Sequence, residues 1–128
     1  MRERILEQGR KRMTHGEKKI AKIVEELTMY FFTMGADKIE SGIEREGNLM
    51  KITFRANYAP EERDRLYVLE EYLNEPKNEG MEDFYWELAG SGDPGETSQL
   101  LLVGMMIDKA EIIIGEEAVS IVIFKELD

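Results

Sequence analysis

The spacing of apolar residues predicts a long helix near the start of the chain. They recur at three- and four-residue steps, as expected for a helix buried along one side: Ile20, Ile23, Val24, Leu27, Tyr30, Phe31 and Met34. Thr14 and Glu17 stand before this stripe in the spacing of a capping box. Gly35 follows the stripe as a glycine that ends a helix. We therefore expect the helix between Thr14 and Gly35.

Two other regions show the two-residue period of β-strands. Apolar or small residues alternate with polar ones at Ile39, Ser41 and Ile43, and again at Met50, Ile52, Phe54 and Ala56. The turn-forming stretch 44–48 separates these two segments and predicts a hairpin. A second hairpin is predicted at the end of the chain, where EIII and AVSIVIF flank residues 115–117.

Three further helices are predicted between the hairpins. Pro60 suits the first position of a helix and precedes the stripe Leu66, Leu69, Tyr72 and Leu73. MEDFYWEL (81–88) predicts a short helix, and Asp93-Pro94 begins another that runs through Asp108 and is apolar nearly all round. The order predicts an α+β two-layer sandwich, with helices on one face of a mostly antiparallel mixed sheet. We expect one domain over residues 14–128, preceded by a helical arm at 1–13.

The charge of the chain narrows the classes of partner. The net charge is −10, but residues 1–24 carry eight Lys/Arg and three Asp/Glu, so this part is +5 and the remainder is −15. An acidic body repels nucleic-acid phosphates, so DNA and RNA are not expected partners. No apolar run is long enough to span a membrane, and there is no cysteine. A cytoplasmic protein is expected.

The basic arm also predicts self-association. A helix of about twelve residues is marginal in water without packing, so residues 1–13 need a surface to lie on. The acidic body of a second copy offers complementary charge, and a two-fold interface uses each arm on the other subunit. We expect a homodimer through the N-terminal region; the alternative is a frayed arm on a monomer.

Two segments resemble a known family. VEELTMYFFTMGADKI is similar to the N-box helix and following strand of the GHKL (histidine kinase-like) ATPase domain. LLLVGMMIDKAEIIIGEEAVSIVIFKEL is similar to the closing helix and hairpin of that domain. The resemblance covers roughly residues 14–127 and is closest to the anti-sigma-factor serine kinases. It implies the histidine-kinase-like ATPase fold.

The resemblance also implies that the ATP site is degenerate. Glu26 falls at the general base of kinase members, although a solvated helix carboxylate is an equally good reading. The magnesium-binding asparagine is replaced by Tyr30, a poor ligand for a cation that prefers compact oxygen ligands. Ala56 and Tyr58 replace the aspartate and the glycine of the motif that holds adenine, and Asn57 lies between them on the opposite face of the strand. The phosphate loop around Thr97 lacks its glycines.

The resemblance, together with the losses at the ATP site, implies a non-catalytic function. We expect a regulatory, protein-interaction domain with no cofactor and no metal, which binds a protein partner and neither nucleic acid nor membrane. Two alternatives remain: an ATP-dependent anti-sigma-type serine kinase with Glu26 as base, and a small-ligand sensor. The sensor would use a vacated pocket at Tyr30, Ala56, Asn57, Tyr58 and Thr97. The helices at 60–73 and 81–88 are expected to be ordered and to cover the old site.

Overall fold

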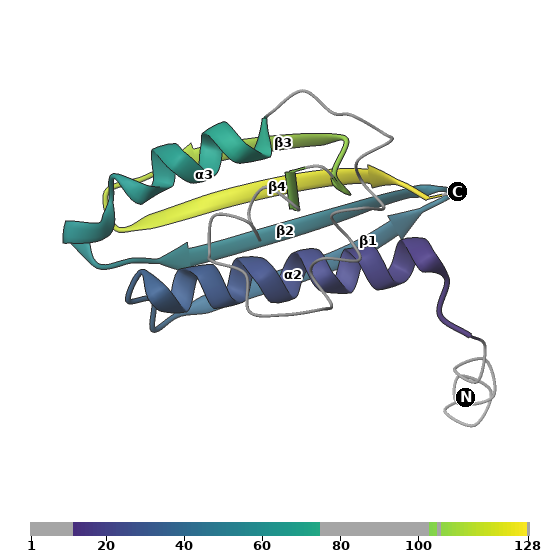
Figure 1. The fold of residues 1–128 in the computed structure, drawn as a ribbon, viewed down its shortest axis with the longest axis horizontal. Helices are drawn as coiled ribbons and strands as arrows, with labels where there is room; N and C mark the ends of the chain where they lie inside the picture. The colour runs from purple at the N-terminus through teal and green to yellow at the C-terminus, as the bar shows by residue number, and fades with distance from the viewer. Residues whose placement is uncertain (1–11, 75–102, 105, 128) are drawn as a thin grey trace.

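The computed structural model describes residues 12–74, 103–104 and 106–127, which form two helices and a four-stranded sheet (Figure 1). The helices are α2 (His15–Thr33) and α3 (Arg65–Leu73), and a short 3-10 turn, η1 (Pro60–Glu62), precedes α3. The strands are β1 (Ile39–Glu46), β2 (Leu49–Asn57), β3 (Lys109–Ile114) and β4 (Ala118–Glu126). The fold is α+β, as the sequence predicted.

Helix α2 begins and ends at the signals read from the sequence. The Glu17 amide donates to Thr14 Oγ1 (3.0 Å), and the Thr14 amide donates back to Glu17 Oε1 (2.9 Å), so the capping box is complete. At the other end Gly35 has φ +82°, and the Ala36 amide donates to the Phe31 carbonyl (3.0 Å). This left-handed ending turns the chain directly into β1.

The sheet has the order β1-β2-β4-β3, and every neighbouring pair of described strands is antiparallel. Both predicted hairpins are present, and β2 pairs with β4 at the centre. Gly47 lies in the first hairpin turn with φ +61°. The mixed sheet expected from the sequence is therefore antiparallel throughout the described strands.

The two faces of the sheet differ. One face packs under the helices and supplies the core with Met50, Ile52, Phe54 and Ala56 from β2 and Val119, Ile121 and Ile123 from β4, all at most 7% exposed. Helix α2 lies over β1 and β2, and α3 lies beside β3 (Figure 1). The other face carries the alternate residues of the same strands, and no described element covers it.

The helix predicted to begin at Pro60 begins later. Bonds from the Glu62 amide to the Ala59 carbonyl (2.8 Å) and from the Arg63 amide to the Pro60 carbonyl (3.3 Å) close a 3-10 turn. The α-helix starts only at Arg65. The expectation of one helix from Pro60 was wrong, since a 3-10 turn precedes α3. The Arg63 side chain, which directly follows this turn, reaches the β3–β4 turn.

The predicted helix at 81–88 and most of the one after Asp93 lie outside the described residues. Residues 103, 104 and 106 are helical, and Val103, Met106 and Ile107 are fully buried. These three residues agree with a central position for the end of that helix. Among the described residues, no helix is long and apolar enough to cross a membrane.

Candidate functional site

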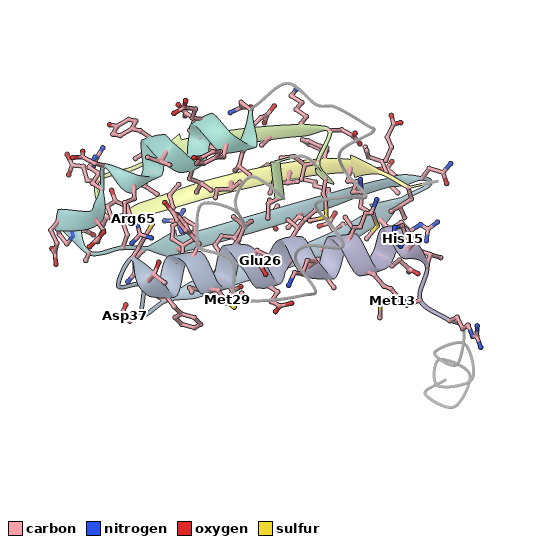
Figure 2. The ribbon with its side chains drawn as sticks, viewed as in Figure 1. Met13, His15, Glu26, Met29, Asp37 and Arg65 are labelled. Carbon is pink, nitrogen blue, oxygen red and sulfur yellow. The ribbon has the colours of Figure 1, made fainter. Side chains whose placement is uncertain are left out.

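Tyr30 lies at the contact between the two helices. The ring is 5% exposed, and its hydroxyl donates to the Arg65 carbonyl of α3 (2.9 Å). The Arg65 guanidinium lies 4.8 Å from the ring centroid and donates to Thr33 Oγ1 (2.8 Å) and to the Thr33 carbonyl (3.1 Å). Figure 2 places Arg65 at the C-terminal end of α2, where its positive charge complements the helix dipole. Tyr30 is thus part of a helix–helix contact.

Glu26 is buried in the middle of α2 (Figure 2). Its exposed fraction is 3%, so the interpretation of this residue as a solvated carboxylate was wrong. Lys22 Nζ lies 2.8 Å from Glu26 Oε1, one helical turn away. This oxygen has no partner with hydrogen-bond geometry among the described residues, so the contact is an ion pair. A buried carboxylate depends strongly on such a countercharge.

Ala56 and Asn57 have structural contacts. Ala56 is 1% exposed, faces the helices and pairs with Val119. The Asn57 side-chain oxygen accepts from the amides of Asp37 (2.9 Å) and Lys38 (3.1 Å). The asparagine therefore holds the loop between α2 and β1 against the end of β2.

Tyr58 joins the end of β2 to the β3–β4 turn. Its ring is 7% exposed, and its hydroxyl lies within hydrogen-bond distance of the Gly115 and Glu116 carbonyls. Arg63 Nη1 donates to the same hydroxyl (3.1 Å) and to the Gly115 carbonyl (3.2 Å). The Tyr58 hydroxyl thus donates its hydrogen to a carbonyl and accepts a hydrogen bond from Arg63, so the phenol has both a hydrogen-bond acceptor and a hydrogen-bond donor as partners.

A cleft of about 380 Å³ opens at this end of the sheet. Ala56, Asn57 and Tyr58, all predicted site residues, contribute to its lining. The rest of the lining is strongly charged and comes from the neighbouring strands and the β3–β4 turn: Lys38, Glu40, Arg55, Pro60, Glu116, Glu117 and Ala118. Tyr30 lies elsewhere, and Thr97 is outside the described residues. The structure thus brings together three of the five predicted pocket residues.

A second hollow adjoins this cleft on the uncovered face. It encloses about 370 Å³ and is bordered by Arg55, Thr53 and Val122, with Gly42 between them and the edge of the sheet. Gly42 pairs with Thr53 and has no side chain to fill the space. Arg55 borders both hollows, and its guanidinium donates to Ser120 Oγ (3.3 Å).

Sequence reasoning did not single out Arg55, Lys38 or the exposed residues of β4. The signal was present in the alternation that predicted the hairpins, because every second position of ITFRA and AVSIVIF lies on the second face of the sheet. What the alternation lacked was the order of the strands, which decides the neighbours of each exposed side chain. Arg55 became a candidate only after β2 was placed beside β4.

The comparisons with known proteins are negative. No protein-family model matches the chain, and neither a curated protein nor a solved structure is significantly similar to it.

Proposed function

We propose that this protein is a regulatory, non-catalytic interaction domain that binds another protein through the uncovered face of its sheet. The observation that carries the proposal is the character of this face. Val122 and Phe124 are half-buried at its centre, and Leu49 (38% exposed) and Ile113 (73% exposed) extend the apolar surface. Apolar and aromatic residues surrounded by charges are typical of protein interfaces.

The charges around this apolar surface support a specific interaction. In the register of β1 and β2, Glu40 lies opposite Arg55, and Glu44 lies opposite Lys51. All four side chains are exposed. Opposite charges side by side on adjacent strands stabilise the sheet and also give a pattern that a partner can recognise. A face that only had to remain in water would not need the valine and the phenylalanine.

The geometry around Tyr30 supports the proposed loss of ATP chemistry. Under the resemblance to histidine kinase-like ATPases, Tyr30 stands where magnesium would be held. Here its hydroxyl donates to a backbone carbonyl, and the Arg65 guanidinium lies against its ring. A fixed positive charge beside this position disfavours a divalent cation. We place the domain in the cytoplasm, as part of the same proposal.

A small-ligand sensor remains the second candidate because the cleft at Asn57 and Tyr58 is large enough for a small molecule. Its lining carries both cations, at Lys38 and Arg55, and carboxylates, at Glu40, Glu116 and Glu117. This mixed charge suits a zwitterionic ligand better than a nucleotide triphosphate, which would meet three carboxylates.

Two experiments test the proposal. A photo-reactive phenylalanine analogue replaces Thr53, which is exposed on the uncovered face, in cells of the source organism. The control carries the analogue at Tyr67, which is 53% exposed on α3. We expect one discrete protein adduct from Thr53 that is lost on Val122→Glu and is absent from the Tyr67 control. The same pattern from both positions, or none from Thr53, would contradict the proposal.

Titration calorimetry with ATP and ADP distinguishes the proposed function from the kinase alternative. We expect no ATP or ADP binding tighter than roughly millimolar, with or without magnesium. Micromolar, magnesium-dependent binding of ATP would restore the serine-kinase interpretation. Binding of a zwitterionic metabolite that is lost on Arg55→Ala would instead favour the sensor.

A further inference from the structure

A single row of side chains crosses the uncovered face of the sheet. In the register of the four strands, Glu44 lies opposite Lys51, Lys51 opposite Phe124, and Phe124 opposite Lys109. All four are on the face that α2 and α3, the two described helices, leave uncovered, and the three charged residues are exposed. From β1 to β3 the row therefore reads acid, base, aromatic ring, base.

This row is complementary to itself. When a second sheet is laid face to face on the first, with a two-fold axis parallel to the strands between β2 and β4, β1 lies over β3 of the other copy. Glu44 then faces Lys109 of the second copy, and Lys51 faces the ring of Phe124. The first contact is an ion pair, and the second is a cation–π pair. The symmetry makes each of them twice.

The adjacent row fits the same arrangement. It consists of Gly42, Thr53, Val122 and Glu111. The two-fold axis places Thr53 over Val122 and brings Glu111 over the hollow at Gly42, which Arg55 borders. The carboxylate of one copy thus enters a space that the other copy leaves open beside a guanidinium.

Other symmetric arrangements oppose like charges. A two-fold axis across the strands at Thr53 would place Lys51 over Arg55 and Glu44 over Glu40, which is unfavourable. Pairing of two β1 edges would bring together strands that carry Glu40, Glu44 and Glu46, and charge of this kind is a common protection of edge strands.

We propose that the partner of the uncovered face is a second copy of this chain, in a face-to-face dimer with its two-fold axis parallel to the strands. The inference rests on the proposed function, because it names the protein that the interaction face binds. Four strands about 4.8 Å apart and about 27 Å long present a footprint of about 500 Å² per copy. An area of this size is at the low end of specific interfaces and gives a dimer with Kd of about 1–100 µM.

The test exchanges charges at the two ends of the row. Glu44 and Lys109 belong to opposite edges of the sheet, three strand spacings or about 14 Å apart within one chain. This separation exceeds the Debye length of about 8 Å at physiological salt, so the two side chains have little coupling inside a monomer. Any strong coupling between their substitutions must come from contact between copies.

Sedimentation equilibrium of the full chain measures the dimer Kd of the wild type and five variants. We expect Glu44→Lys and Lys109→Glu each to raise Kd about tenfold, because each change affects two symmetric contacts. The double variant should return Kd to within about threefold of the wild type. Phe124→Glu should leave a monomer, whereas Phe32→Glu, which changes a phenylalanine 62% exposed on α2, should leave Kd unchanged.

The outcomes separate this inference from the proposed function. A wild-type chain that stays monomeric at about 200 µM, above the whole expected range of Kd, overturns the dimer. If that monomer still forms an adduct from Thr53 with a different protein, the proposed function stands and only the identity of the partner is wrong. A third outcome is a dimer whose Kd does not change on charge exchange at Glu44 and Lys109. If that dimer dissociates in a triple variant with Arg10→Glu, Lys11→Glu and Arg12→Glu, the interface lies in the N-terminal region and the sheet interface is overturned. Circular dichroism of each variant checks that it is folded.

Discussion

The two faces of this sheet are made by the same strands, yet their side chains differ in burial and in neighbours. Phe54 on β2 faces the helices, is 1% exposed, and lies with its ring centroid 5.3 Å from that of Phe31. Phe124 on β4 faces the other way, is half-buried, and lies between Lys51 and Lys109. The covered face is apolar and buried, whereas the uncovered face carries charged residues around half-buried apolar ones. In β2 the alternation of apolar and polar residues already identifies the core face. In β4 both sets of alternate residues are mostly apolar, so only the neighbouring strands show which set belongs to the core.

Removing the same side chain from each face gives the largest expected difference. Phe54→Ala should lower the free energy of unfolding by about 3–5 kcal/mol, because it leaves a cavity in a closed core. Phe124→Ala should cost only about 1 kcal/mol, because its site is open to water. Urea unfolding at about 1 µM protein, where association contributes little, measures both. Equal losses would show that the uncovered face is also a core face.

Glycine substitutions compare a buried position with one on the uncovered face by adding a methyl group, where the phenylalanine variants removed a side chain. At Gly104 a Cβ would lie 2.1 Å from the Tyr72 carbonyl oxygen, so the backbone must move. We expect Gly104→Ala to cost about 1–3 kcal/mol. At Gly42 the nearest atom is the Thr53 hydroxyl at 3.0 Å, which can rotate away. Gly42→Ala should stay within about 0.5 kcal/mol of the wild type in thermal or urea unfolding. A Gly104 variant as stable as the wild type would contradict this close approach.

The contact that holds the two helices over the covered face is expected to be weaker. Tyr30→Phe removes the hydroxyl that donates to the Arg65 carbonyl and leaves this part-buried carbonyl without that donor. The loss should be about 1 kcal/mol. Tyr67→Phe is the matched control, since that ring is 53% exposed on α3, and it should change stability by less than about 0.5 kcal/mol. Urea unfolding of the two variants side by side measures the difference, and an unchanged Tyr30 variant would mean that the hydroxyl bond contributes nothing.

The smallest effect is expected at the start of α2, away from either face. Thr14→Ala removes the acceptor for the Glu17 amide and should cost about 1 kcal/mol or slightly less. Thr14→Ser keeps a hydroxyl at the same place and should preserve stability. Thermal unfolding followed by circular dichroism distinguishes the two substitutions. If both lower the midpoint equally, the capping bond is not the cause.

Much of the fold follows from local signals in the sequence. The capping box at Thr14, the left-handed Gly35 and the alternation from Ile39 to Ala56 each act over a few residues, so they are legible without the rest of the chain. They were sufficient for α2, for both hairpins and for the α+β class. The start of α3 was misplaced because Pro60 begins a 3-10 turn and not the α-helix itself. The contact of Arg63 with the β3–β4 turn, about fifty residues away along the chain, is not legible from local signals.

The candidate site depended on tertiary structure to a much greater degree. Three features of the site could not be read locally: the burial of Glu26, the contact of Tyr30 with Arg65, and the position of Arg55 between two hollows. Each depends on residues distant in the sequence or on the side to which a residue faces. The row from Glu44 to Lys109 has no counterpart along the chain, because it exists only where β2 and β4 bring their neighbours together. Capping, turn formation and the alternation of apolar residues act locally, so the sequence determined which segments become helices and hairpins. The order of the strands in the sheet decided which side chains meet, because it brings together residues that are far apart along the chain.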